Sequence, residues 1–345
     1  MDATSALAAI IGGRTLTREE ARATMASVMA GEATAAQLGA LVATLHLRGE
    51  TVDEIVGFAE AMRSAAVPVT LANGAVDIVG TGGSRVDPFN ISTVSSIVAA
   101  GAGGKVAKHG NRAATGKCGS ADVLEALGVK IDLGPDEVAR CVEEVGVAFL
   151  FAPRYHPAMR HASPVRREIR IRTVFNLLGP ISNPARVRRM VLGVATPQVG
   201  ENIARALGEL GADHVLVVHG EDGLDDISPT GSTRTWELRG GTVTTGSIDP
   251  AALGLPLGTV LDIQSGDPQA NAATARSIVA GEQGARRTAV LLNAGAALLV
   301  GAVAESLREG TLLAAAAIDT GAAASTLERF VATSQRLGAG ASGPA

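Results

Sequence analysis

From Val76 onward, short apolar segments alternate with glycine-containing loops and helical patterns. The segment VDIVG (76–80) reads as a strand, and STVSSIVAAGA (92–102) reads as the helix that follows it. Another strand, KVAKHG, precedes a helix, SADVLEALG, that Ser120 caps and Gly128 ends. Further strand candidates are VAFLFA, RMVLGVAT, HVLVVHG and TAVLLNAG. This alternation predicts an α/β domain with a central, mostly parallel sheet flanked by helices.

The chain before this region carries a different pattern, that of consecutive helices. Three helix starts have the form of a capping box, in which a threonine is followed three residues later by Glu or Gln. They are Thr17 with Glu20, Thr34 with Gln37, and Thr51 with Glu54. We therefore predict a small helical domain over residues 1–72, an α/β domain over 73–337, and a disordered tail over 338–345.

Composition excludes several classes of function. Aromatic residues make up only 2% of the 345 residues, which argues against binding single-stranded nucleic acid by base stacking. The net charge of -4 argues against a general polyanion binder. The two cysteines, Cys118 and Cys141, form no disulfide framework, and no Cys/His cluster has zinc-ligand spacing.

These features predict a cytoplasmic protein. The N-terminus has an acid at Asp2 and no basic region, so it is a poor signal peptide. The uncharged run from Thr288 to Ala304 is interrupted by Asn293, Gly295 and Gly301. We interpret it as a strand and a buried helix rather than a membrane span.

A basic loop lies in the segment KHGNRAATGKCGSAD (108–122), which resembles a damaged P-loop. A P-loop requires Ser or Thr after the Gly-Lys pair, but Cys118 follows Gly116 and Lys117. Three of the four lysines of the chain nevertheless lie between Lys105 and Lys117. The loop therefore keeps the charge to bind an anion without the magnesium-binding hydroxyl of an ATPase.

A second loop, VGTGGSRVDPFNIST (79–93), leaves the first strand. Its glycines Gly80, Gly82 and Gly83 permit backbone amides to approach an anion closely. Ser92 and Thr93 then stand at the N-terminus of a helix, where anions are favoured. Taken alone, this pattern also fits an ordinary tight turn, but beside the basic loop it predicts a phosphate site.

Two further segments add acidic and basic groups. The segment VVHGEDGLDDIS ends a strand with Asp225 and Asp226, and adjacent carboxylates suit Mg²⁺, although a solvated acidic turn has the same pattern. Between Arg160 and Arg189 there are eight arginines and one glutamate. Of these, Arg166 offers a planar fork for a carboxylate or a phosphate.

In combination, these motifs resemble the anthranilate phosphoribosyltransferases. The matching strings are GTGG, NIST, KHGNR, GSAD, HPAM, PVRRE, RTVFNLLGP and VVHGEDGLDDIS, in order along nearly the whole chain. The resemblance implies a helical domain, completed by a central segment near 164–188, and a larger α/β domain that binds phosphoribosyl pyrophosphate. It also implies a homodimer formed through the helical domain.

The resemblance implies the site residues as well. Phosphoribosyl pyrophosphate would contact Gly80, Gly83, Ser84, Asn90, Ser92, Thr93, Lys108, Asn111, Arg112, Gly116 and Ser120. Anthranilate would contact Gly80, Asn111, His156 and Arg166, and two magnesium ions would use Ser92, Asp225 and Asp226. Lys108 and Arg166 would be the catalytic residues, with Lys108 neutralising the leaving pyrophosphate and Arg166 reading the anthranilate carboxylate.

The sequence departs from the family pattern at several positions. Ser84 stands where Asp is common, Pro88 where Thr is common, and Asp226 where Glu is usual, and Thr115-Gly116 replaces a frequent Ser-Ser. Two alternatives therefore stay open here. One is a paralogue that uses another aromatic acceptor, and the other is a non-catalytic relative that binds nucleic acid through the 160–189 segment.

Overall fold

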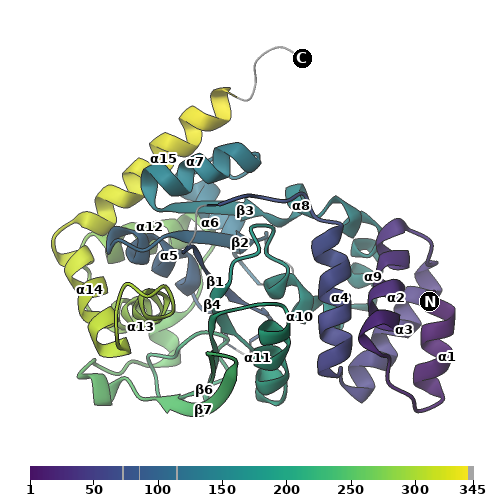
Figure 1. Ribbon diagram of the computed structural model, residues 1–345. Coiled ribbons are helices and arrows are strands. Elements are labelled where there is room, and N and C mark those ends of the chain that lie inside the picture. Colours follow the sequence, from purple (N-terminus) through teal and green to yellow (C-terminus); the bar gives the residue numbers. More distant parts are fainter. Residues whose placement is uncertain (72–73, 85, 114–115, 341–345) are drawn as a thin grey trace.

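The computed structural model describes residues 1–71, 74–84, 86–113 and 116–340. Four helices form a layer at one side of the molecule (Figure 1): α1 (Ala3–Ile11), α2 (Arg18–Ala30), α3 (Ala35–Arg48) and α4 (Val52–Ser64). The three predicted capping boxes are confirmed, because Thr17, Thr34 and Thr51 each exchange both hydrogen bonds with the residue three positions later. Local sequence therefore sets where three of these helices begin.

The buried carboxylate of Glu54 joins the helices of this layer. One of its oxygens accepts a hydrogen bond from the Leu16 amide at 2.8 Å, and the other accepts from the Thr51 amide at 2.9 Å. The same carboxylate pairs with the Arg48 guanidinium. A capping residue of α4 thus also fixes the α1–α2 connection and the end of α3.

The larger part of the chain contains a seven-stranded sheet in the order β3-β2-β1-β4-β5-β6-β7. The first five strands are parallel, and β6 and β7 continue the sheet antiparallel. The mostly parallel prediction is confirmed. The strands are β1 (Val76–Gly80), β2 (Val106–Gly110), β3 (Val147–Phe151), β4 (Arg189–Gly193), β5 (His214–Gly220), β6 (Thr233–Arg239) and β7 (Thr242–Ile248).

The two faces of the sheet belong to two hydrophobic cores. Val191 of β4 faces the first core, whereas its neighbours Met190 and Leu192 face the second, as the two-residue period of a strand requires. The first core contains α5 (Ile91–Gly101), α6 (Ser120–Leu127), α7 (Pro135–Val145), α12 (Pro268–Val279), α13 (Ala285–Val300), α14 (Leu307–Asp319) and α15 (Ala322–Gly340). The second core contains α11 (Gly200–Glu209) and the helical layer (Figure 1).

A central segment joins the helical layer from far along the chain. It comprises α8 (Ala152–Tyr155), a 3-10 turn (Pro157–His161), α9 (Ser163–Ile169) and α10 (Val174–Ile181). Helix α9 contacts α3, and α10 contacts α3 and α4. Further 3-10 turns lie at Pro197–Val199, Ala251–Leu253 and Val260–Ile263.

Two expectations are wrong. The run TAVLLNAG lies inside helix α13 rather than in a strand. This helix is buried on almost all sides between α5, α14 and the sheet, so its sequence from Ala289 on is almost entirely apolar and lacks the period that separates helix from strand. The predicted tail also begins too early, because residues 338–340 continue α15 after the buried Leu337. Residues 341–345 lie outside the described residues.

The run from Thr288 to Ala304 therefore lies in α13 as far as Val300 and contains no strand. Within the described ranges, no helix has both the length and the hydropathy needed to cross a membrane.

Candidate active site

The candidate site lies where the order of the parallel strands reverses direction. Strand β1 has β2 on one side and β4 on the other, and the carboxyl ends of such a pair form the usual crevice for ligands in an open α/β sheet. Asp225, which follows β5, reaches this point. A Cβ atom built on Gly80 would lie 2.3 Å from its carboxylate, and one on Gly193 would lie 1.6 Å from its carbonyl oxygen. Both strands must end in glycine for Asp225 to fit.

The glycine loop after β1 is held by the same carboxylate. The Gly82 amide donates to Asp225 Oδ2 at 2.7 Å, and Gly82 and Gly83 have φ values of 68° and 73°, a conformation that favours glycine. Arg172 Nη1 donates to the Gly83 carbonyl at 3.2 Å. The loop is thus fixed from β5 on one side and from the segment before α10 on the other.

Lys108 carries a positive charge into the interior at the end of β2. Its side chain is only 3% exposed, and its ammonium group donates to the Ile78 carbonyl at 2.6 Å and to Ser92 Oγ at 3.1 Å. Burial lowers the pKa of Lys108, while the neighbouring carboxylates of Asp77 and Asp226 act to raise it. The predicted Lys108 and Ser92 therefore meet at the N-terminus of α5.

The β5 loop supplies two buried carboxylates, and one of them, Asp226, interacts with Lys108. Burial raises the pKa of Asp225, and burial together with the Asp225 charge raises the pKa of Asp226 well above its usual range. Among the described residues, none donates a hydrogen bond to the Asp226 carboxylate. The protein therefore balances the negative charge of this pair only in part, and a bound cation would balance the rest.

The donor set fits magnesium. In the described part of the chain, no three His, Cys, Asp or Glu side chains come together as a closed metal site. Magnesium does not need one, because it binds through one or two carboxylates and takes its other ligands from water and substrate phosphate. Asp225, Asp226 and the Ser92 hydroxyl, which accepts a hydrogen bond from Lys108, are donors of this type.

Asn90 and Thr93 differ in what their side chains offer a ligand. The Asn90 amide is already used, because it donates to the Cys118 carbonyl at 3.0 Å and accepts from Asn271 at 2.9 Å. It thereby ties the basic loop to α5 and α12. The Thr93 hydroxyl is buried and has no hydrogen-bond partner in the described structure.

The basic loop between β2 and α6 is organised around Asp122. This carboxylate accepts hydrogen bonds from the amides of Ala113 at 3.0 Å and Gly119 at 2.8 Å. Arg112 is bound by its own loop, since it pairs with Asp122 and Glu125. Residues 114–115, which include Thr115 of the expected phosphate loop, lie outside the described residues.

The other predicted residues of this loop take different positions. Asn111 is exposed, and its carbonyl oxygen accepts a hydrogen bond from the Ser120 hydroxyl at 3.1 Å. Gly116 lies beside Asp87, whose carboxylate oxygen would be 3.0 Å from a built Cβ. Ser84 donates its hydroxyl hydrogen to the Val86 carbonyl.

Arg166 has a guanidinium without an acidic partner. Its Cζ lies 5.4 Å from the centroid of the Phe175 ring, and burial lowers its pKa. Among the described residues, no side chain or carbonyl forms an ion pair or a hydrogen bond with this guanidinium. A half-buried arginine that stacks on an aromatic ring is ready to bind a planar carboxylate.

The comparisons with known proteins agree with this arrangement. Models described as "Glycosyl transferase family, helical bundle domain" and "Glycosyl transferase family, a/b domain" match residues 4–66 and 72–324. An anthranilate phosphoribosyltransferase of Methylorubrum populi is 49% identical over 95% of this chain and 97% of its own length. The chain belongs to the anthranilate phosphoribosyltransferase family.

Solved structures of this family have the same fold. The enzyme from Thermus thermophilus has a TM-score of 0.91 and 44% identity, covering 97% of this chain and 100% of that one. The Saccharomyces cerevisiae enzyme, in complex with phosphoribosyl pyrophosphate and Mg, has a TM-score of 0.89 and 25% identity, covering 97% and 98%.

The buried residues that hold this phosphoribosyltransferase site in place were not predicted from the sequence. Asp77 is fully buried in β1 and accepts hydrogen bonds from the His109 amide at 3.1 Å and from Asn183 at 2.8 Å. Burial raises the pKa of Asp77 to about 6. The one available indication was an acid inside the apolar strand VDIVG. Nothing local in the sequence pairs it with Asn183.

Two buried histidines behind Lys108 stay uncharged. The rings of His109 and His156 lie 5.1 Å apart, and the Nε2 atom of each is buried without a partner. Burial lowers the pKa of His109 to about 3 and that of His156 to about 4. His156, predicted to contact anthranilate, therefore presents a neutral ring.

We expect neither histidine to titrate between pH 5 and pH 8, which NMR of the imidazole resonances measures directly. In the unfolded chain these two histidines would take up protons near pH 6.5, whereas in the folded chain they do not. The free energy of unfolding therefore decreases as the pH falls from 6.5 toward 4. Asp77 has the opposite effect: because its pKa is raised in the folded chain, it adds stability as the pH falls from 6 to 4. A midpoint near 6.5 for either buried ring would contradict the assignment.

Proposed function

We propose that this chain transfers the phosphoribosyl group of phosphoribosyl pyrophosphate to the amine of anthranilate. The products are N-(5-phosphoribosyl)anthranilate and pyrophosphate, in tryptophan biosynthesis. The observation that carries the proposal is the meeting of the Gly80–Gly83 loop, Lys108 with Ser92, and the Asp225–Asp226 pair at the switch point of the sheet. Membership of the family supports the same conclusion.

The proposed roles follow from the charges that develop in this reaction. Magnesium, when bound, supplies positive charge to the pyrophosphate, and we propose two ions held by Ser92, Asp225 and Asp226. Lys108 adds the ammonium charge on the same side, and the amide of Gly83 and the N-terminus of α5 complete the anion site. Arg166 binds the carboxylate of anthranilate and orients its amine.

The aniline nitrogen of anthranilate attacks as the neutral amine, so no side chain has to deprotonate it first. The bond from the anomeric carbon to pyrophosphate breaks as the carbon–nitrogen bond forms, and the nitrogen then loses its proton. Catalysis in this scheme is positioning and charge stabilisation. His156 contributes an uncharged ring to the site. A cationic ring at this position would repel the positive charge that develops on the anomeric carbon as pyrophosphate leaves.

The nucleic-acid alternative receives no support from the basic segment. Arg172 donates to the Gly83 carbonyl, Arg189 donates to the Val300 carbonyl, and Arg188 pairs with Asp213. These arginines serve separate parts of the fold instead of forming one basic surface. The paralogue alternative concerns the acceptor alone and is tested with Arg166.

We predict that Arg166→Ala raises the KM for anthranilate about 10- to 100-fold, because a bidentate charge-assisted contact is lost. The KM for phosphoribosyl pyrophosphate should stay within about twofold. The loss of anthranilate fluorescence during turnover measures both constants. Arg167→Ala, at the exposed neighbouring position, is the matched control. An unchanged KM in Arg166→Ala would remove this residue from the acceptor site and favour another aromatic acceptor.

The acidic pair gives a second test. Asp225→Asn with Asp226→Asn should lower kcat at least about 100-fold and raise the magnesium concentration needed for half-maximal rate. Glu221→Gln, an exposed change at the start of the same loop, should leave both quantities unchanged. Calorimetric titration with magnesium and phosphoribosyl pyrophosphate provides a readout besides activity. Full turnover by the double variant would place the metal elsewhere.

We propose a homodimer formed through the helical layer. Two large apolar side chains of this layer are exposed, Ile11 by 70% on α1 and Leu47 by 88% on α3, and these two helices contact each other. A paired surface would remove both from water.

Leu47→Glu should therefore shift the chain to a monomer in sedimentation experiments at micromolar concentration. Leu261→Glu is the matched control, since Leu261 is 74% exposed but belongs to the α/β domain. A wild-type chain that sediments as a monomer, or equal dissociation by both variants, would contradict the proposed interface.

A further inference from the structure

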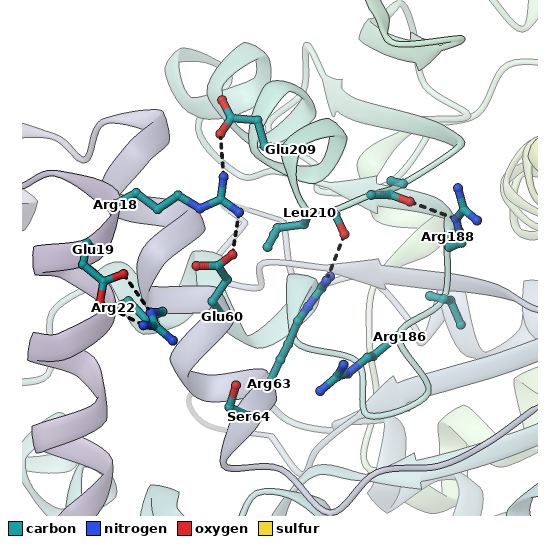
Figure 2. A pocket seen from close by; sticks show the side chains of 13 residues that line it. Arg18, Glu19, Arg22, Glu60, Arg63, Ser64, Arg186, Arg188, Glu209 and Leu210 are labelled. Atoms are coloured by element: carbon teal, nitrogen blue, oxygen red, sulfur yellow. Dashed lines mark hydrogen bonds and ion pairs between the residues drawn. The ribbon is translucent and has the colours of Figure 1, made fainter.

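A second charged cleft lies between the helical layer and the sheet domain, away from the candidate active site. Its volume is about 750 Å³, and its walls come from α2, α4, the α10–β4 connection and the end of α11. Five arginines and three glutamates line it, so positive side chains outnumber negative ones by two. Figure 2 shows Arg18, Glu60, Arg63 and Arg186 around the same space, whereas Arg188 lies at its far side against the Gly211 carbonyl.

Three of the five arginines have acidic partners. Arg18 bridges Glu60 and Glu209, Arg22 pairs with Glu19, and Arg188 pairs with Asp213. These contacts use all three glutamates of the lining, so Arg63 and Arg186 are the two arginines without an acidic partner. With Asp213, the partner of Arg188, included, five arginines face four carboxylates. Neither Arg63 nor Arg186 forms an ion pair with a described residue.

Arg63 is held in place by main-chain groups alone. Its Nε donates to the Ile181 carbonyl at 2.9 Å, and its Nη1 donates to the Leu210 carbonyl at 3.5 Å, so it joins α4 to the ends of α10 and α11. Its Nη2 makes no hydrogen bond to a described residue. Burial and the nearby charge of Arg186 lower the pKa of Arg63 to about 10.

Arg186 is brought beside Arg63 by a fixed and unfavourable backbone conformation. Its φ is 47°, in the left-handed region that residues with a side chain rarely adopt. Its amide donates to the Asn183 carbonyl at 2.9 Å, and Asn183 is itself anchored to Asp77 of β1. Two guanidiniums with no acidic partner are thus placed close together on independently fixed segments (Figure 2).

We propose that this cleft is a binding site for a doubly charged oxyanion of the phosphate class, held by Arg63, Arg186 and the Ser64 hydroxyl. Two neighbouring guanidiniums without an acidic partner can each bind oxygens of one dianion, and guanidinium forks match the geometry of phosphate oxygens. The bound anion would connect the end of α4 to the α10–β4 connection, and therefore the helical layer to the sheet. Its binding would stabilise this junction.

The test is calorimetric titration of the full chain with inorganic phosphate, without magnesium, for the wild type and for Arg186→Gln. Arg186→Gln should weaken binding at least about tenfold, because one charged fork is lost. Arg22→Gln is the matched control, since Arg22 lines the same cleft but is paired with Glu19, and its affinity should be unchanged. Arg186→Lys, which keeps the charge without the fork, should give an intermediate affinity.

Thermal unfolding gives an independent readout. Phosphate should raise the melting temperature of the wild type and of Arg22→Gln but not that of Arg186→Gln. Equal phosphate affinity in the wild type and Arg186→Gln would overturn the proposal, as would binding abolished by saturation with phosphoribosyl pyrophosphate. Acetate binding as tight as phosphate binding would overturn the assignment to a dianion. These outcomes do not depend on whether the chain transfers a phosphoribosyl group.

Discussion

The burial of one positive charge, that of Lys108, organises the candidate active site. An ammonium group that is 3% exposed requires hydrogen-bond acceptors and negative neighbours, because otherwise it would lose its proton. The protein supplies them from several elements: Ile78 on β1, Ser92 on α5, and the Asp77 and Asp226 carboxylates. Each of these groups is itself placed by the sheet, so the charge and the fold around it stabilise each other.

A steric constraint of similar importance acts where β1 and β4 end. Asp225 fits between these strands only because Gly80 and Gly193 have no Cβ atom. From there its carboxylate holds the Gly82 amide, so one aspartate orders the loop that would face a phosphate while keeping an oxygen for a cation. Burial raises the pKa of Asp225, which means that its charged form is disfavoured. A bound metal ion, carried with a phosphorylated substrate, would stabilise that charge.

Sequence patterns predicted the parts of this structure that depend on local chemistry. The capping boxes located three helices, and the apolar segments located the five parallel strands. Strand β6 was missed because it carries charged residues between its apolar ones, and β7 because it is mostly polar and has no buried residue. Helix α13 was misread because it is buried on almost every side. Among the site residues, Asn90 and Arg112 bind neighbouring protein groups, and their contact with phosphoribosyl pyrophosphate stays a prediction. Which partner satisfies a polar side chain depends on tertiary contacts such as Asn183 with Asp77, which no local pattern encodes.

The proposed catalytic groups come from both parts of the molecule. Lys108 belongs to the sheet, whereas Arg166 belongs to α9, which packs on α3 in the helical layer. The distance between the two groups therefore depends on how the layer sits against the sheet. Asn183 and Arg63 act at that junction, since Asn183 ties the returning chain to β1 and β2 and Arg63 ties α4 to the ends of α10 and α11. A substrate enclosed between Lys108 and Arg166 requires a fixed distance between these two groups. The residues that set this distance therefore affect catalysis although they lie outside the site.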